Sequence, residues 1–182
     1  MFRANKNLLR SSCLTVLLIT PSEPVDASEW IFKKEDKAFG DVDATAMAIG
    51  DTSIAFVRCS GGELSVAVAT PEDWKESSSA MNALGPKLIM AIDGSEPFTY
   101  TATLGENGAH KFLASIEEEA STREAIEKMI AAKKKIEIGI EIGGKRFYAS
   151  KLSAAGASKK FQAVLDTCAS KAKTETKTLE KK

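Results

Sequence analysis

A strict alternation of apolar and polar positions over residues 136–142 is the feature that most constrains the fold of this chain. Isoleucine occupies every second position, and glutamate or glycine falls between the isoleucines. Because successive side chains of a strand point to opposite faces, this pattern predicts a strand with one buried face. Gly143 and Gly144 follow directly, and glycine tolerates the positive φ that a two-residue hairpin turn requires. We therefore expect residues 145–150 to return as an antiparallel partner strand.

The same alternation predicts further strands earlier in the chain. Residues 53–59 and 63–70 both alternate, and residues 60–62 (Ser-Gly-Gly) between them favour a tight turn, so we expect a β-hairpin. Pro71 is expected to end this hairpin, and the polar, serine-rich residues 72–82 are expected to form a loop. Three more strands are predicted, at 88–92, 97–104 and 111–116.

Two helices complete the predicted fold. Ser121 followed by Glu124 matches a capping box, in which each side chain satisfies a backbone N–H at a helix start. Residues 157–168 carry apolar side chains at helical spacing, which predicts a second helix near the end of the chain. Together these patterns predict an α+β domain of mainly antiparallel β-structure, a small sandwich or curled sheet, with one mid-chain helix and a C-terminal helix.

The two ends of the chain differ in composition from its middle. The first ten residues are basic, and the apolar stretch that follows them ends at Pro21, too short to cross a bilayer. This order is typical of a secretory signal, so we expect residues 1–27 to be cleaved and no transmembrane anchor to remain. Residues 28–170 would then form a single globular domain. Residues 171–182 hold one large apolar side chain, Leu179, and we expect them to be a disordered basic tail.

Cysteine usage and charge narrow the class of protein further. Cys59 and Cys168 remain after the predicted cleavage, and thiols pair in the oxidising environment that exported proteins meet. Both fall on the predicted apolar faces of their elements, so a disulfide between them is the simplest assignment, with two free thiols as the alternative. The 25 basic and 25 acidic side chains leave no basic excess, so we expect no nucleic-acid partner.

No set of residues matches a catalytic, cofactor-binding or metal-binding signature. The only histidine, His110, lies in a turn-like stretch without a serine-nucleophile motif, and no cluster of ligands has metal-site spacing. We therefore expect no catalytic residue, no cofactor and no metal. The candidate for a ligand groove is Trp74 with Asp73, joined by Asp93 as a further loop acid, although aromatic side chains on strands are ordinarily core.

Three stretches carry a family resemblance. They are FVRCSGGELSVAV at 56–68, IMAIDG at 89–94 and RFYASKLSAAGASKKFQAVLDTC at 146–168. In these stretches the chain resembles small bacterial periplasmic proteins of the type VI secretion-associated and invasion-associated locus B families. The resemblance implies a disulfide-stapled, β-rich accessory or interaction protein of the cell envelope, without catalysis, in which Cys59 and Cys168 have a structural role.

The sequence thus predicts a periplasmic or secreted, non-enzymatic interaction protein whose partner is another envelope or secreted protein. Two other functions stay open at this point. One is a small envelope hydrolase that acts on a glycan or peptidoglycan through loop carboxylates near Trp74, such as Asp73 and Asp93. The other is an inhibitor that inserts an exposed loop into the active site of an enzyme. The sequence leaves the oligomeric state open.

Overall fold

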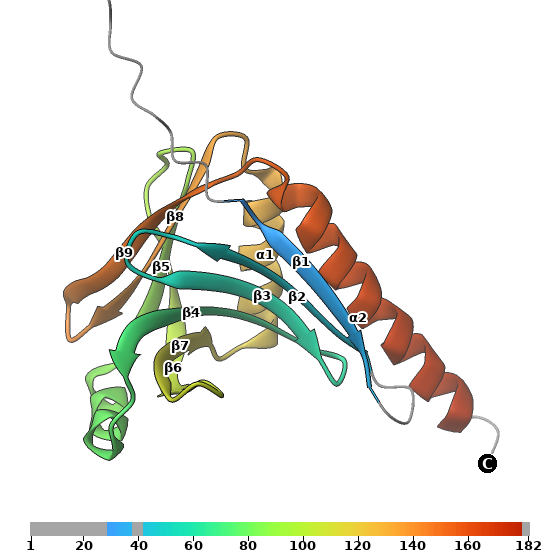
Figure 1. The fold of residues 1–182 in the computed structure, drawn as a ribbon, viewed down its shortest axis with the longest axis horizontal. Coiled ribbons are helices and arrows are strands. Elements are labelled where there is room, and N and C mark those ends of the chain that lie inside the picture. The colour runs from blue at the N-terminus through green and yellow to red at the C-terminus, as the bar shows by residue number, and fades with distance from the viewer. Residues whose placement is uncertain (1–28, 38–41, 180–182) are drawn as a thin grey trace, which may run out of the picture.

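The computed structural model describes residues 29–37 and 42–179, so the predicted signal peptide, 1–27, lies outside the described residues. Within that part, the chain forms a nine-stranded sheet, two α-helices and one 3-10 helix (Figure 1). The elements are β1 (Ile31–Asp36), β2 (Val42–Ile49), β3 (Ile54–Ser60), β4 (Glu63–Asp73), η2 (Glu76–Leu84), β5 (Lys87–Ile92), β6 (Phe98–Glu106), β7 (Lys111–Ile116), α1 (Glu119–Ala131), β8 (Lys135–Ile142), β9 (Lys145–Ser153) and α2 (Ala157–Leu179). The α+β class, mainly antiparallel β, is confirmed.

The nine strands form one curled sheet, which decides between the two predicted architectures. Their order is β1-β2-β3-β4-β7-β6-β5-β8-β9, and each neighbouring pair is antiparallel. The sheet curls far enough to bring β9 back to the first strands: the hydroxyls of Ser53 and Ser150 lie 2.7 Å apart. The Trp30 indole also donates a hydrogen bond of 2.7 Å to the carbonyl of Ser153.

The two α-helices cover one face of this sheet. Helix α2 packs along β2 and β3, and α1 packs against α2 and β4 (Figure 1). The alanines at alternate positions of β2 are fully buried, and these small side chains let α2 approach the sheet closely. Trp30 and Phe161 are also fully buried and meet edge to face, with 4.6 Å between their ring centroids.

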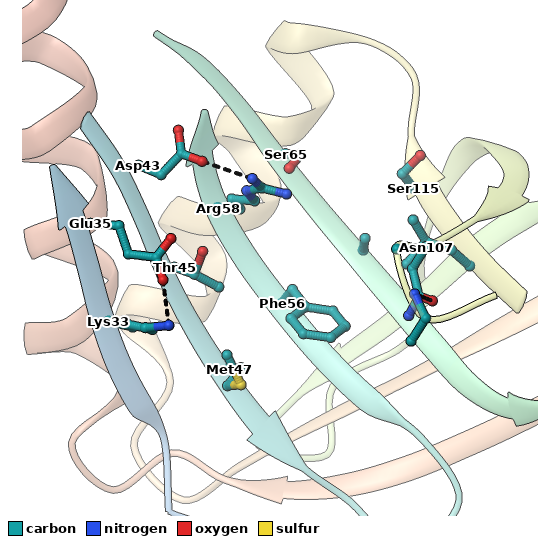
Figure 2. Close-up of a pocket in the computed structure, with 14 residues that line it drawn as sticks. Lys33, Glu35, Asp43, Thr45, Met47, Phe56, Arg58, Ser65, Asn107 and Ser115 are labelled. Carbon is teal, nitrogen blue, oxygen red and sulfur yellow. Dashed lines mark hydrogen bonds and ion pairs between the residues drawn. The ribbon is translucent and has the colours of Figure 1, made fainter. Parts of the chain in front are cut away.

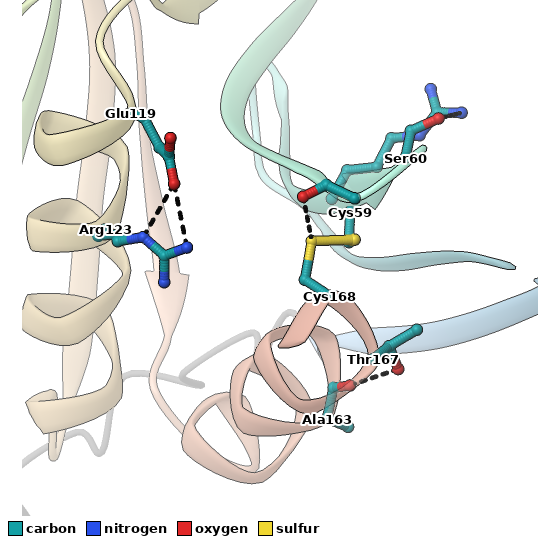
Figure 3. The surroundings of a disulfide bond; sticks show 9 residues. Cys59, Ser60, Glu119, Arg123, Ala163, Thr167 and Cys168 are labelled. Carbon is teal, nitrogen blue, oxygen red and sulfur yellow. Dashed lines mark hydrogen bonds and ion pairs between the residues drawn. A yellow bond between two sulfur atoms is a disulfide. The ribbon is translucent and has the colours of Figure 1, made fainter. Parts of the chain in front are cut away.

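The predicted disulfide is confirmed. Cys59 at the end of β3 bonds to Cys168 on α2, and their Cα atoms lie 5.6 Å apart. Figure 3 shows the bond where α2 passes the end of β3, beside the first turn of α1. Both cysteines are buried, as their alternating and helical patterns predicted. The disulfide therefore fixes the last helix to the first half of the sheet.

The region around Pro71 differs from the prediction. Strand β4 continues through Pro71 to Asp73, and the expected loop at 72–82 is largely the 3-10 helix η2. Proline lacks a backbone N–H, so within sheets it is confined to edges and irregularities. Pro71 lies where the pairing of β4 with β7 shifts register, between Ala69 and Asp73, so the strand continues past it.

The helix boundaries also differ from the prediction. Helix α1 begins at Glu119, and the predicted capping box is wrong: the Ser121 hydroxyl bonds to the carboxylate of Glu118, 3.2 Å away, instead of capping a backbone N–H. Helix α2 continues to Leu179, through most of the stretch for which we predicted a disordered tail. Strands β1 and β2 were not predicted at all.

We predict that replacing Cys59 and Cys168 together by alanine lowers the free energy of unfolding by about 2–5 kcal/mol. The reason is that the bond spans 109 positions of the sequence, so its loss releases a long loop in the unfolded chain. Urea unfolding followed by circular dichroism measures the change. Reductant should bring the unmodified protein to the stability of the double variant and leave that variant unchanged. Equal stability of all four samples would contradict the structural role of the bond.

Candidate functional site

A cavity of about 620 Å³ lies between η2 and the hairpin of β8 and β9, and we call it the η2 groove. Its walls come from η2, the end of β4, the start of β7 and the β8–β9 hairpin. The side chains that line it include Met81 and Leu84 of η2, Glu72 and Asp73 of β4, Phe112 of β7, and Ile142, Phe147 and Tyr148 of the hairpin. Elements far apart in the sequence therefore meet at one site.

The wall formed by η2 is held in place by a side chain that imitates strand pairing. The amide of Asn82 accepts a hydrogen bond from the backbone N–H of Leu104 at 2.8 Å and donates one to the carbonyl of Leu104 at 3.0 Å. Gly85 then ends η2 in the left-handed conformation, with φ of 60°, which glycine adopts without strain. These contacts fix the 3-10 helix against β6.

The opposite wall depends on a β-bulge. Neighbouring residues of a strand normally point to opposite faces, yet Phe147 and Tyr148 both line the η2 groove. The pairing of β8 with β9 shifts between Ile138 and Ile140, and Tyr148 at the shift has φ of 52°. Such a backbone conformation is strained for an aromatic residue, and strain of this kind gathers at functional sites. The bulge thus turns two consecutive aromatic rings toward one cavity.

The rim of the η2 groove is unusually apolar for an exposed surface. In the described part of the chain, five large apolar side chains are exposed, and Met81, Leu84 and Phe147 belong to this groove, at 37%, 58% and 41% exposure. Single exposed apolar side chains are ordinary, whereas a cluster around a cavity marks an interaction site. The groove is therefore the strongest candidate for binding a partner.

Of the predicted ligand residues, Asp73 lines this groove, whereas Trp74 only packs on one of its lining residues. Asp73 forms an ion pair of 2.5 Å with Lys111, and the hydrogen bond and charge of Lys111 lower the pKa of Asp73. Trp74 is half-buried and packs on Phe112, with 5.6 Å between ring centroids, so it holds the Phe112 ring that lines the groove. Burial, and then the hydrogen bond from the Tyr148 hydroxyl to Glu72, raise the pKa of Tyr148 to about 12.

The third predicted residue, Asp93, lies elsewhere. It follows β5 beside the start of β6, whereas Asp73 lies beyond the other end of β6, which is about 25 Å long. The Asp93 carboxylate accepts three backbone N–H groups, from Lys133, Lys134 and Lys135, at 2.7–2.9 Å. Asp93 therefore joins the end of α1 to β8 and does not share a groove with Asp73 and Trp74.

The geometry also bears on acid catalysis by these two carboxylates. A glycosidase needs a carboxylic acid whose pKa is raised, close to a second carboxylate. The backbone bonds, that of Lys135 first, lower the pKa of Asp93, and Lys111 lowers that of Asp73. Their separation and their lowered pKa values both argue against Asp73 and Asp93 as a catalytic pair.

His110 lies in the β6–β7 turn, in the left-handed conformation with φ of 56°, and contacts Glu106. Its side chain is 86% exposed, as expected of a solvated turn residue. Among the described residues no group of three or more His, Cys, Asp and Glu side chains could hold a metal ion. No helix in the described part is long and apolar enough to span a membrane.

A second cavity, of about 490 Å³, lies on the face of the sheet that the helices leave open, and we call it the sheet cavity. Strands β1, β2, β3, β4 and β7 form its floor, and the turn at 107–109 lies along one side (Figure 2). The sequence did not predict this site, because its patterns did not predict β1 and β2. The one available signal was that Phe56 and Arg58 share the face of β3 opposite Cys59.

Asp43 is the buried charge of the sheet cavity. Its side chain is 6% exposed, and one carboxylate oxygen, Oδ2, accepts hydrogen bonds from Lys37 at 2.6 Å and from Arg58 at 2.8 Å. Lys37, and then Arg58, hold the pKa of Asp43 well below its usual range. The other oxygen, Oδ1, is buried without a hydrogen-bond partner among the described residues.

No protein-family model, curated protein or solved structure matches this chain. The resemblance to the type VI secretion-associated and invasion-associated locus B families therefore stays a prediction.

We predict that Asp43→Asn lowers the free energy of unfolding by about 1–2 kcal/mol at pH 7, because two cations lose their buried partner. The folded pKa of Asp43 is lower than the unfolded one, so its contribution is complete above about pH 3.9 and is lost as the pH falls. The difference between the variant and the unmodified protein should thus shrink from pH 4 toward about pH 2.

Urea unfolding at a series of pH values measures this difference. Asp36→Asn, at an exposed carboxylate on β1, is the matched control and should change stability by less than about 0.5 kcal/mol. A difference for Asp43→Asn that stays constant with pH would contradict the ion-paired state of Asp43.

Proposed function

We propose that this protein is an exported, non-enzymatic interaction protein of the cell envelope, and that its η2 groove holds an apolar segment of a partner protein. The partner would be another envelope or secreted protein. The proposal rests chiefly on one observation: three of the five exposed large apolar side chains in the described residues surround this groove.

The size and the fixed walls of the groove are evidence that its partner is a protein segment. Its volume of about 620 Å³ can take several side chains, and its walls are fixed by the Asn82 amide and by the β8–β9 bulge. A preformed cavity binds without the entropic cost of ordering its walls. Charged groups of both signs, Glu72 and Lys145, lie beside the apolar rim, which suits an apolar anchor flanked by polar residues.

Two observations support the export part of the proposal. The sequence of residues 1–27 has the order of a secretory signal. The Cys59–Cys168 bond is of the kind that persists in oxidising compartments, such as the periplasm or the extracellular space. The separation of Asp73 from Asp93 favours this function over a hydrolase that would use these two carboxylates together.

Site-specific photocrosslinking in the native cells tests this function. A benzophenone amino acid replaces Leu84 on one wall of the groove, or Ile49 on β2, which is 61% exposed and lies outside the groove. We expect one protein to crosslink at position 84 and not at position 49. Adding Phe147→Ser on the opposite wall should reduce this product several-fold, because the substitution removes an aromatic anchor.

The outcomes distinguish binding in the groove from non-specific crosslinking to exposed apolar positions. Equal products at positions 84 and 49, or a product at 84 that Phe147→Ser leaves unchanged, would contradict docking in the groove. A lack of any product at position 84 would contradict it as well. Unfolding curves of Phe147→Ser should keep a single cooperative transition, with a loss of at most about 2 kcal/mol, because the ring is only partly buried.

A further inference from the structure

The sheet cavity combines a polar row and an apolar row of side chains. The strand register places Lys33, Thr45, Arg58 and Ser65 opposite one another across β1 to β4. The neighbouring row on the same face carries Met47, Phe56 and Ala67, followed by Ser115 of β7. In Figure 2 the Phe56 ring and Met47 lie beside each other, below the Arg58 guanidinium. The cavity is thus amphipathic, with its charged end and its apolar floor in adjacent rows.

Two cations, Lys33 and Arg58, and two carboxylates, Glu35 and Asp43, line the charged end of the cavity. Lys33 pairs with Glu35, while Lys37 and Arg58 share the single carboxylate of Asp43. Because Lys37, outside the lining, also bonds to Asp43, the one negative charge of Asp43 is shared and does not fully neutralise Arg58. Among the described contacts, Arg58 bonds through Nη2 alone, to Asp43 and to the Ser60 hydroxyl. Its other guanidinium N–H groups stay available, and a guanidinium presents them in a geometry that matches a carboxylate or a phosphate.

Asp43 positions this guanidinium. The buried carboxylate bonds to Arg58 at 2.8 Å, so one side of the guanidinium is fixed while the side chain as a whole stays 49% exposed. A fixed cation at the edge of an apolar floor loses less freedom on binding than a mobile surface lysine. The volume of the cavity, about 490 Å³, lies within the range of small-ligand sites.

We propose that the sheet cavity binds an amphiphilic anion, a molecule with a carboxylate or phosphate head that contacts Arg58 and Lys33 and an apolar tail that lies on Phe56 and Met47. The site goes beyond the proposed function, because the sheet cavity and the η2 groove share no lining residue. On β7, the neighbouring residues Phe112 and Leu113 line the η2 groove and the sheet cavity respectively.

Isothermal titration of the folded protein with decanoate and with decyl phosphate tests this site. We expect saturable 1:1 binding of at least one of the two, and the stronger binder distinguishes a carboxylate head from a phosphate head. Decanol and decyltrimethylammonium share the tail but not the anion, and acetate and inorganic phosphate lack the tail. We expect each of these four to bind at least tenfold more weakly.

Variants then assign the binding to the cavity. Arg58→Gln should weaken the binding about tenfold, because it removes a charge-assisted hydrogen bond to the head. Phe56→Ser should weaken it to a similar extent through the tail. Lys33→Gln, at a side chain that is 64% exposed, is a second charge variant that leaves the Asp43 cluster intact and should weaken binding a few-fold.

Matched controls complete the test. Arg123→Gln removes an arginine of similar exposure on α1, and Phe147→Ser removes a ring of the η2 groove, so both should bind as the unmodified protein does. The proposal is overturned if neither anion binds saturably, if the cationic or neutral amphiphile binds equally well, or if Arg58→Gln and Arg123→Gln behave alike. Failure here would leave the photocrosslinking result at the η2 groove unaffected, so the two proposals are separable.

Discussion

The bond between Cys59 and Cys168 is the constraint on which the arrangement of this molecule depends. It joins the end of β3 to α2, so the last helix is fixed across the first strands of the sheet (Figure 3). With α2 in place, α1 packs on it and on β4, and one face of the curled sheet is covered. A domain of this size has a modest free energy of unfolding, so a covalent link of such long range is a large part of its stability.

Covering one face of the sheet leaves the other face free for binding. Along β3, Ala55, Val57 and Cys59 lie under the helices, while Phe56 and Arg58 line the sheet cavity. Period-two alternation therefore places stability and binding on opposite sides of the same strands. The η2 groove arises differently, because a bulge at Tyr148 breaks the alternation and turns two aromatic rings to one side.

Sequence patterns predicted the fold class, the disulfide and most strands, because period-two contrast and glycine turns are local signals. β2 was not predicted, because alanine alternates there with threonine and methionine and its two faces therefore differ little in polarity. At the candidate site, Asp73 is the one predicted residue that lines the groove, and the side chains that complete the groove were not predicted. Leu84 and Phe147 line the same groove only because long-range strand pairing brings their elements together. The backbone groups that bind Asp93 likewise lie about 40 residues away from it in sequence.

We propose that the protein is exported and that one disulfide joins its last helix to its sheet, and the intact mass of the protein from its native cells can show both features at once. The mass is measured after alkylation, with and without prior reduction. We expect a chain that starts at Ser28, in which Cys59 and Cys168 are alkylated only after reduction. A chain that retains residues 1–27, with both thiols alkylated without reduction, would mean that the protein is not exported and that the two cysteines are not bonded.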